Sequence, residues 1–154
     1  MTDLVPADLP PARRAALAEV LGEGLATARA LETLYRAFAT AATMPTLARE
    51  LLTLAVATTR VAEVLAPLAT ALGAEPGSGG PDEPVDGRAS VSAASGAERA
   101  PLFARAFKGE RALARACAEA VTLLDGAALP TLGGLAADLA RDMVQLRHLY
   151  LGYS

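Results

Sequence analysis

Aromatic residues make up only 4% of this 154-residue chain, and cysteine and histidine each occur once. A single cysteine excludes an internal disulfide and a thiolate metal site. Because Cys117 falls on an apolar helical stripe, we expect it to be a small buried hydrophobe. His148 falls opposite the apolar stripe of its predicted helix, so we expect it to face solvent and not to bind a metal.

The chain also lacks a strong charge of either sign, since its formal net charge is −3. Its basic residues are scattered and paired with acids, which argues against a nucleic-acid interface. The first residues lack the basic and apolar regions of a signal peptide, and no uncharged run reaches the ~18–20 apolar residues of a membrane span. We therefore expect a cytoplasmic protein without a nucleic-acid or membrane partner.

No segment alternates apolar and polar residues as a half-buried strand does, whereas four segments repeat apolar residues in steps of four and three. This period keeps each stripe on one helix face. The sequence therefore predicts an all-α four-helix bundle in a single domain, residues 1–154. The stripes are Leu17, Leu21, Gly24, Ala28, Leu31, Tyr35 and Phe38; Leu47, Leu51, Leu54, Thr58, Val61, Leu65, Leu68 and Leu72; Phe103, Phe107, Glu110, Ala114, Cys117, Val121 and Leu124; and Leu132, Leu135, Leu139, Asp142, Leu146, Leu149 and Tyr153.

The connections between the helices predict the topology. The first and third are short, so each joins an antiparallel hairpin. Residues 74–97 are acidic and rich in glycine, proline and serine, and we expect a partly flexible crossover along the bundle. A loop within a simple up-and-down bundle is the alternative. With residues 1–9 as an extension, the expected helices are 10–41, 45–73 (ending at Gly73 and kinked at Pro67), 98–125 and 129–151.

Two acids interrupt the apolar stripes, and each needs a hydrogen bond, a cation or a metal because an unpaired buried charge is very costly. For Glu110 the sequence offers the Tyr35 hydroxyl on the inward face of the first helix, or a neutral carboxyl with a raised pKa. For Asp142 it offers Arg141, Arg147 or a neighbouring helix. We expect Thr58 to bond a preceding backbone carbonyl.

Three short stretches carry a resemblance to a known family: residues 68–73 at the end of the second helix, Gly109-Glu110 in the third, and Leu129-Pro130 before the fourth. Over nearly its whole length the chain resembles a bacterial branch of the ferritin-like, rubrerythrin-related superfamily. The resemblance implies two antiparallel hairpins joined by a long crossover. It also implies a dimetal centre with one Glu from each of two helices and a Glu-x-x-His pair from each of the others.

Position by position, this chain keeps little of that centre. Glu110 stands at the third-helix ligand position, and Glu32 is the best candidate on the first helix. The segment from Asp142 to Gln145 replaces Glu-x-x-His on the fourth helix, and Thr58 begins a stretch with neither acid nor imidazole on the second. We therefore expect no cofactor and no metal; if a metal is bound, its ligands are Glu32, Glu110 and Asp142 and the ion is iron or manganese.

The favoured function is therefore non-catalytic: a bundle that has lost its dimetal centre and acts in binding or assembly, as a homo-oligomer or with a protein partner. The main alternative is a carboxylate-bridged di-iron or manganese protein for oxidation or iron handling. Arg141 followed by His148 resembles the signature of HEPN-type helical ribonucleases. A carrier of apolar ligands is the fourth possibility, with a cavity opened by Gly24, Ala28 and Ala114.

Overall fold

The computed structural model describes residues 9–73, 99–124 and 129–153, and these residues form α-helices without a strand. The predicted all-α fold is therefore confirmed for the described residues, and the predicted helix ends agree within two residues. The predicted extension at 1–9, apart from Leu9, and the predicted crossover at 74–97 lie outside this part of the chain. The helices are α1 (Pro11–Ala41), α2 (Pro45–Ala71), α4 (Arg99–Leu124) and α5 (Leu129–Tyr153).

Proline and glycine set the ends of the first two helices. Pro11 and Pro45 occupy the first helical positions of α1 and α2, where a fixed φ helps and the missing N–H is not needed. After α2, Gly73 adopts a left-handed φ of 70° and donates its N–H to the Thr70 carbonyl at 3.0 Å, as helix-ending glycines do. The predicted stop at Gly73 is therefore confirmed. Pro67 lies inside α2, which continues to Ala71.

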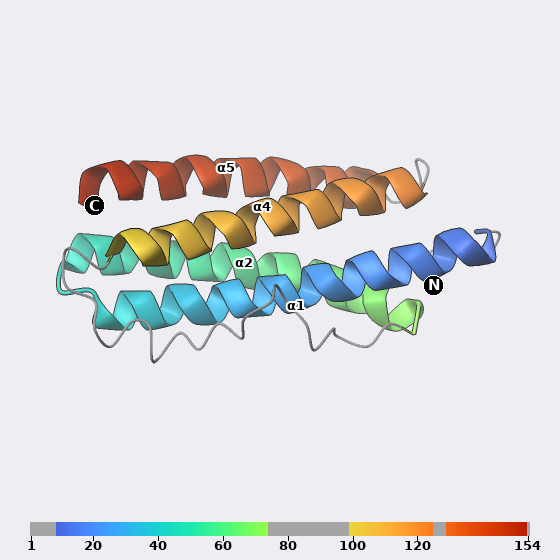
Figure 1. Cartoon of the computed structure of the whole chain (residues 1–154), viewed down its shortest axis with the longest axis horizontal. Coiled ribbons are helices and arrows are strands. Elements are labelled where there is room, and N and C mark those ends of the chain that lie inside the picture. The colour runs from blue at the N-terminus through green and yellow to red at the C-terminus, as the bar shows by residue number, and fades with distance from the viewer. Residues whose placement is uncertain (1–8, 74–98, 125–128, 154) are drawn as a thin grey trace.

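The helices lie side by side along one long axis (Figure 1). Within each hairpin, α1 with α2 and α4 with α5, the helices run in opposite directions, whereas α2 and α4 run in the same direction. α4 packs against α1 and α5. α2 packs mainly against α1, and its contact with α5 is smaller. The end of α2 and the beginning of α4 therefore lie at opposite ends of the bundle.

Leucine and alanine fill the core, as the four stripes predict. Most stripe residues are buried, among them Cys117 at 1% exposure, which confirms its predicted role as a small core side chain. Phe107, Ala114, Val121 and Leu72 are only partly buried.

The few aromatic residues gather at the end of the bundle where α1 ends and α4 begins. The Phe103 ring packs edge-to-face against Phe38 at 5.2 Å and against Tyr150 at 5.5 Å, and Tyr150 also meets Phe107 at 6.2 Å. This aromatic cluster, Phe38, Phe103, Phe107 and Tyr150, joins α1, α4 and α5 into one packed unit. Large rings at such geometry add to the stabilisation that burial alone provides.

By length and composition, α2 is the one helix of the described residues that would be apolar enough to cross a membrane. A core helix passes the same test. α2 has the buried leucine stripe of such a helix, with Leu51, Leu54 and Leu65 at 0–1% exposure, and it also exposes Leu52 and Val56.

Two glycines let α1 and α4 approach closely. A Cβ added at Gly24 would lie 3.3 Å from the Ala116 Cβ, and one added at Gly109 would lie 2.6 Å from Cδ2 and 2.8 Å from Cγ of Leu31. The small residues on these helices therefore bring backbones together. This close approach also sets the register of α1 against α4, with Gly24 beside Ala116 and Leu31 beside Gly109.

Replacing Gly109 by alanine should destabilise the fold although alanine is the better helix former. The gain in helix propensity is about 1 kcal/mol, and forcing Leu31 aside costs about 1–3 kcal/mol, so we expect a net loss of about 1 kcal/mol in urea denaturation. The matched control is Gly134→Ala on α5, where no atom lies within 4 Å of the added Cβ; it should gain about 0.5–1 kcal/mol. Equal gains in both variants would contradict the close α1–α4 contact.

Candidate functional site

A buried hydrogen bond between α1 and α4 forms the centre of the candidate site. The Tyr35 hydroxyl donates to Oε1 of Glu110 at 2.7 Å. Both residues are 0% exposed. The predicted Tyr35–Glu110 partnership is confirmed.

The local packing explains why these two side chains meet. Gly109 brings α4 against Leu31, and Tyr35 follows Leu31 by one turn on the same face of α1. Glu110 follows Gly109 directly on the inward side of α4. The phenol and the carboxyl therefore arrive at the same level of the bundle from adjacent helices.

Asp142 brings a second buried acid from α5. It is 9% exposed, and its Oδ2, like Oε2 of Glu110, has no hydrogen-bond partner among the described residues. Arg141, one of the partners expected for Asp142, instead pairs with Asp138 at 3.7 Å, and the described part of α5 shows no ion pair between Asp142 and Arg147. Within the described ranges, Asp142 therefore forms no ion pair with either arginine that the sequence suggested.

Both acids titrate far above their ordinary range. The pKa of Glu110 is raised to about 7, with burial as the largest cause; the Tyr35 hydrogen bond opposes the shift, and the negative charge of Asp142 adds a smaller increase. Burial raises the pKa of Asp142 to about 6, with Asp138 adding to the shift and Arg141 opposing it. Asp142 therefore ionises first, and its charge then disfavours the ionisation of Glu110.

The same surroundings keep Tyr35 neutral. Burial, and then the charge of Glu110, raise the pKa of the Tyr35 phenol well above its ordinary value. The phenol therefore remains a hydrogen-bond donor at any physiological pH. This hydrogen bond therefore holds Oε1 of Glu110 permanently and leaves only Oε2 without a hydrogen-bond partner among the described residues.

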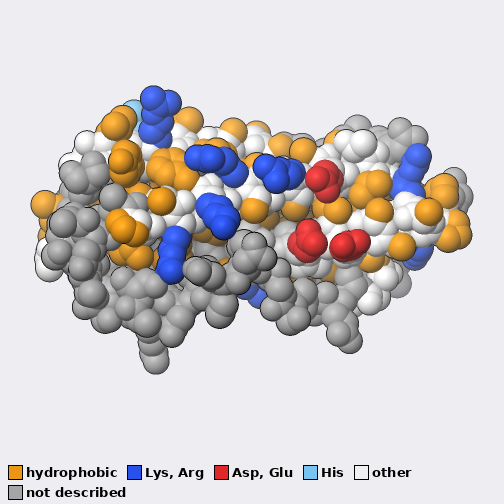
Figure 2. All heavy atoms as spheres, in the orientation of Figure 1, with side chains coloured by type: hydrophobic (Ala, Val, Ile, Leu, Met, Phe, Trp, Pro, Cys, Tyr) orange, Lys and Arg blue, Asp and Glu red, His pale blue; other side chains and the backbone are white. Residues whose placement is uncertain are grey.

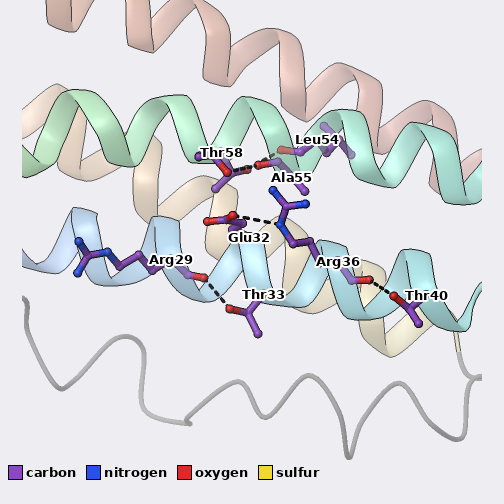
Figure 3. A network of polar contacts seen from close by, with 9 residues as sticks. Arg29, Glu32, Thr33, Arg36, Thr40, Leu54, Ala55 and Thr58 are labelled. Atoms are coloured by element: carbon purple, nitrogen blue, oxygen red, sulfur yellow. Dashed lines mark hydrogen bonds and ion pairs between the residues drawn. The ribbon is translucent and has the colours of Figure 1, made fainter.

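Two candidate site residues, Thr58 and Glu32, bond to other residues of their own helices. The Thr58 hydroxyl donates to the Leu54 carbonyl at 2.8 Å, as predicted. Glu32 lies half-exposed on α1 and pairs with Arg36 at 3.1 Å; Figure 3 shows this pair on α1, with Thr58 on the neighbouring α2. Among the described residues no three Asp, Glu, His or Cys side chains are placed to hold one metal ion. The structure therefore does not bring Glu32 to Glu110 and Asp142.

A hydrogen bond between α2 and α5 adds a residue that the sequence reasoning missed. Gln145 donates its Nε2 proton to Oε2 of the half-buried Glu50. The signal for Glu50 was weak, because it precedes the stripe residue Leu51 and so sits at the edge of the apolar face. Gln145 lies one turn from Asp142 on α5. We call the five residues from the four helices the polar layer: Tyr35, Glu50, Glu110, Asp142 and Gln145.

The structure gives little support to the two remaining alternatives, a helical ribonuclease and a carrier of apolar ligands. His148 is exposed, as predicted, and Arg141 is exposed and bound to Asp138, with no contact between Arg141 and His148 in the described part of α5. For an apolar-ligand carrier, Gly24 was expected to open a cavity, but Ala116 lies close against it.

No family model, no curated protein and no solved structure matches this chain. The chemistry of the polar layer and the charges on the helix surfaces are therefore the features from which a function follows.

Proposed function

We propose that this protein is a ferritin-like four-helix bundle that has lost its dimetal centre and acts in binding or assembly, without catalysis. One observation carries this proposal. Glu110, the acid at the third-helix ligand position, accepts a 2.7 Å hydrogen bond from a buried tyrosine. Because the phenol stays protonated, one of the two oxygens of this carboxylate is occupied by a hydrogen bond within the fold, and only the other could bind a metal.

The other ligand positions support the same conclusion. Thr58 on α2 is bonded to its own backbone, Gln145 on α5 is bonded to Glu50, and Glu32 on α1 is bonded to Arg36. Thr58 and Gln145 supply neither an acid nor an imidazole, and the one carboxylate among the three residues, Glu32, is held by an arginine. The helix directions also agree with a ferritin-like arrangement, because α2 and α4 run the same way, as the second and third helices of that arrangement do.

A carboxylate-bridged iron or manganese protein is the second candidate, and one observation favours it. The free oxygens, Oε2 of Glu110 and Oδ2 of Asp142, are both buried and without a hydrogen-bond partner among the described residues. A cation between them would neutralise two buried charges. Two carboxylates without an imidazole form a poor site for a transition metal, however.

The isosteric change Glu110→Gln separates the two candidates. Under the proposal, the amide oxygen keeps the Tyr35 hydrogen bond and the buried charge disappears, so at neutral pH the melting temperature should stay the same or rise. Protein purified without chelators should contain far less than one metal ion per chain, before and after the change. Elemental analysis and thermal melts measure both.

The metal candidate predicts the opposite result. Glu110→Gln would then lower metal content and melting temperature together, and that joint loss would refute the proposal. Glu63→Gln is the matched control, because it makes the same chemical change at an exposed side chain of α2 that is not a candidate ligand. Exposed substitutions of this kind change the free energy of unfolding by about 0.5 kcal/mol or less, so the control should leave both measurements nearly unchanged.

A further inference from the structure

Basic side chains form a line along the outer side of α4. Lys108, Arg111 and Arg115 are exposed and follow one another in steps of three and four, so they project from one side of the helix. Figure 2 shows Lys and Arg side chains beside hydrophobic ones in the half of the molecule where α4 begins, and the visible Asp and Glu side chains further along. The fold therefore separates charges on this surface that the sequence mixes.

Exposed apolar side chains form a similar line along α5. Val144 and Leu151 are 57% and 67% exposed, and they lie about two turns apart with the exposed Arg147 between them. Tyr150, which is 37% exposed, turns its ring toward α4. The outer side of α5 therefore leaves apolar surface open to solvent next to a cation.

The contact between Phe107 of α4 and Tyr150 of α5 places the two lines side by side. Their ring centroids are 6.2 Å apart, and the two helices run in opposite directions. Counted from this contact toward the middle of the bundle, Arg111 lies ~6 Å along α4, and Arg147 and Val144 lie ~4.5 and ~9 Å along α5. We call the shared surface the basic apolar face, and it comprises the exposed residues Lys108, Arg111, Arg115, Val144, Arg147, Tyr150 and Leu151.

The charges of the basic apolar face have one sign. On α4 the next exposed acid is Glu119, one turn beyond Arg115. On α5 the exposed Asp138 lies more than two turns before Arg147 and pairs with Arg141. No ion pair or hydrogen bond among the described residues involves the cations of the face. A cluster of cations with no acid between them attracts a negatively charged partner, although the chain as a whole has a net charge of −3.

We propose that the basic apolar face binds the surface of an anionic lipid bilayer. Its cations then lie at the headgroup phosphates, and Val144 and Leu151 enter the boundary between headgroups and acyl chains. Cations beside exposed apolar side chains on one side of a helix are typical of proteins that lie on a bilayer without crossing it. A fluid bilayer accepts protruding side chains singly, whereas a folded protein partner would need a matching pocket for each.

This inference rests on the proposed function in binding and names the partner. It differs from the sequence-based expectation of no membrane partner. That expectation rested on the lack of a membrane span and on the scatter of the basic residues along the chain. The fold brings basic residues of α4 and α5 to one surface, and binding there needs no span.

The number of cations sets the expected strength of binding. Each Lys or Arg close to an anionic bilayer strengthens binding by about fivefold. The cations of the face together therefore strengthen binding by several hundredfold, on the order of 5 to the fourth power. This attraction decays within a Debye length, so added salt should release the protein from the bilayer.

Cosedimentation with vesicles tests the electrostatic part. At low salt, wild type should bind phosphatidylcholine vesicles that contain about 30% phosphatidylserine, and it should not bind phosphatidylcholine alone. The double variant Arg111→Glu, Arg147→Glu removes two attractions and adds two repulsions, so its affinity should fall at least about 100-fold. The matched control is Arg49→Glu, Arg60→Glu on the exposed side of α2, which makes the same change in net charge and should stay close to wild type.

The variant Val144→Ser, Leu151→Ser tests the apolar part. Both side chains are exposed, so the melting temperature should change little, whereas the affinity for the anionic vesicles should fall about tenfold with every charge intact. A wild type that ignores anionic vesicles overturns the proposal, and so does binding that survives Arg111→Glu, Arg147→Glu. Soluble polyglutamate bound as tightly as the vesicles, with no effect of the serine changes, also overturns it and indicates an acidic protein partner instead.

Metal analysis of the same samples keeps this inference separate from the proposed function. A metal-free protein that ignores anionic vesicles would remove the bilayer surface and leave the loss of the dimetal centre intact. A protein that binds the vesicles and contains about one or more metal ions per chain would do the reverse.

Discussion

Raising the pH from about 5 to about 8 should lower the free energy of unfolding of this protein by several kcal/mol. Burial raises the pKa of Glu110 from its ordinary 4.5 to about 7, and that of Asp142 from 3.8 to about 6. Between the ordinary and the raised value, the folded state holds a proton that the unfolded state has released, so stability falls as pH rises. At about 1.4 kcal/mol per pKa unit, Glu110 alone contributes on the order of 3 kcal/mol.

The loss should begin near pH 4, accumulate to about pH 7 and then level off, because above that value both acids are ionised in either state. Urea denaturation at steps of pH measures it. The double variant Glu110→Gln, Asp142→Asn removes both titrations, so its stability should be nearly flat over this range and should exceed that of wild type at pH 8. A wild type that becomes more stable from pH 5 to 7 would contradict the buried acid pair.

Tyr35→Phe provides an independent check on the same titration. The Tyr35 hydrogen bond lowers the pKa of Glu110, so its removal should move the end of the stability loss to higher pH. The variant should also lose about 1–3 kcal/mol where Glu110 is ionised, because a buried acceptor is left unsatisfied. An unchanged pH profile would mean that the phenol does not face the carboxyl in solution.

Phe103→Ala should be among the most damaging single changes, with an expected loss of about 3–5 kcal/mol in the free energy of unfolding. The Phe103 ring is 0% exposed and packs edge-to-face against Phe38 of α1 and Tyr150 of α5. Its removal opens a cavity where three helices meet, at the end of the molecule that holds most of the aromatic residues. The end of α5 loses its main support there.

Hydrogen exchange locates the damage, and Phe103→Leu serves as the control. Backbone amides of α5 from about Leu146 onward should exchange faster in Phe103→Ala, whereas Phe103→Leu, which fills most of the space, should cost less than about 1.5 kcal/mol. A small loss spread evenly over all helices would show that the aromatic cluster does not hold α5 in place.

The helices could be predicted because their signals are local. Steps of four and three along the stripes identify one face of a helix, and Pro11, Pro45 and Gly73 have the backbone preferences of helix ends. The arrangement of the hairpins was a weaker inference, since it depended on the length of a connection. Which helix lies next to which, with α4 beside α1, follows from close packing at Gly24 and Gly109 and leaves no periodic pattern in the sequence.

Only part of the polar layer could be predicted for the same reason. Tyr35 and Glu110 both lie on inward stripes, so their meeting followed from the pattern. Glu32 lies one residue from its stripe, a rotation of about 100°, and that rotation turns it toward Arg36 and away from the other acids. Glu50 also lies off its stripe, and it is half-buried only because α5 packs beside it.

The parallel course of α2 and α4 has a kinetic consequence. Contacts inside each hairpin join residues that are close in sequence, whereas the Tyr35–Glu110 hydrogen bond joins positions 75 residues apart. Local contacts form early and distant ones late, so the chain should fold as two hairpins that dock in a slower step. Glu110 loses its hydration in that docking step, and a protonated carboxyl loses less. Docking should therefore be faster in mild acid, which makes the slow step of folding sensitive to pH.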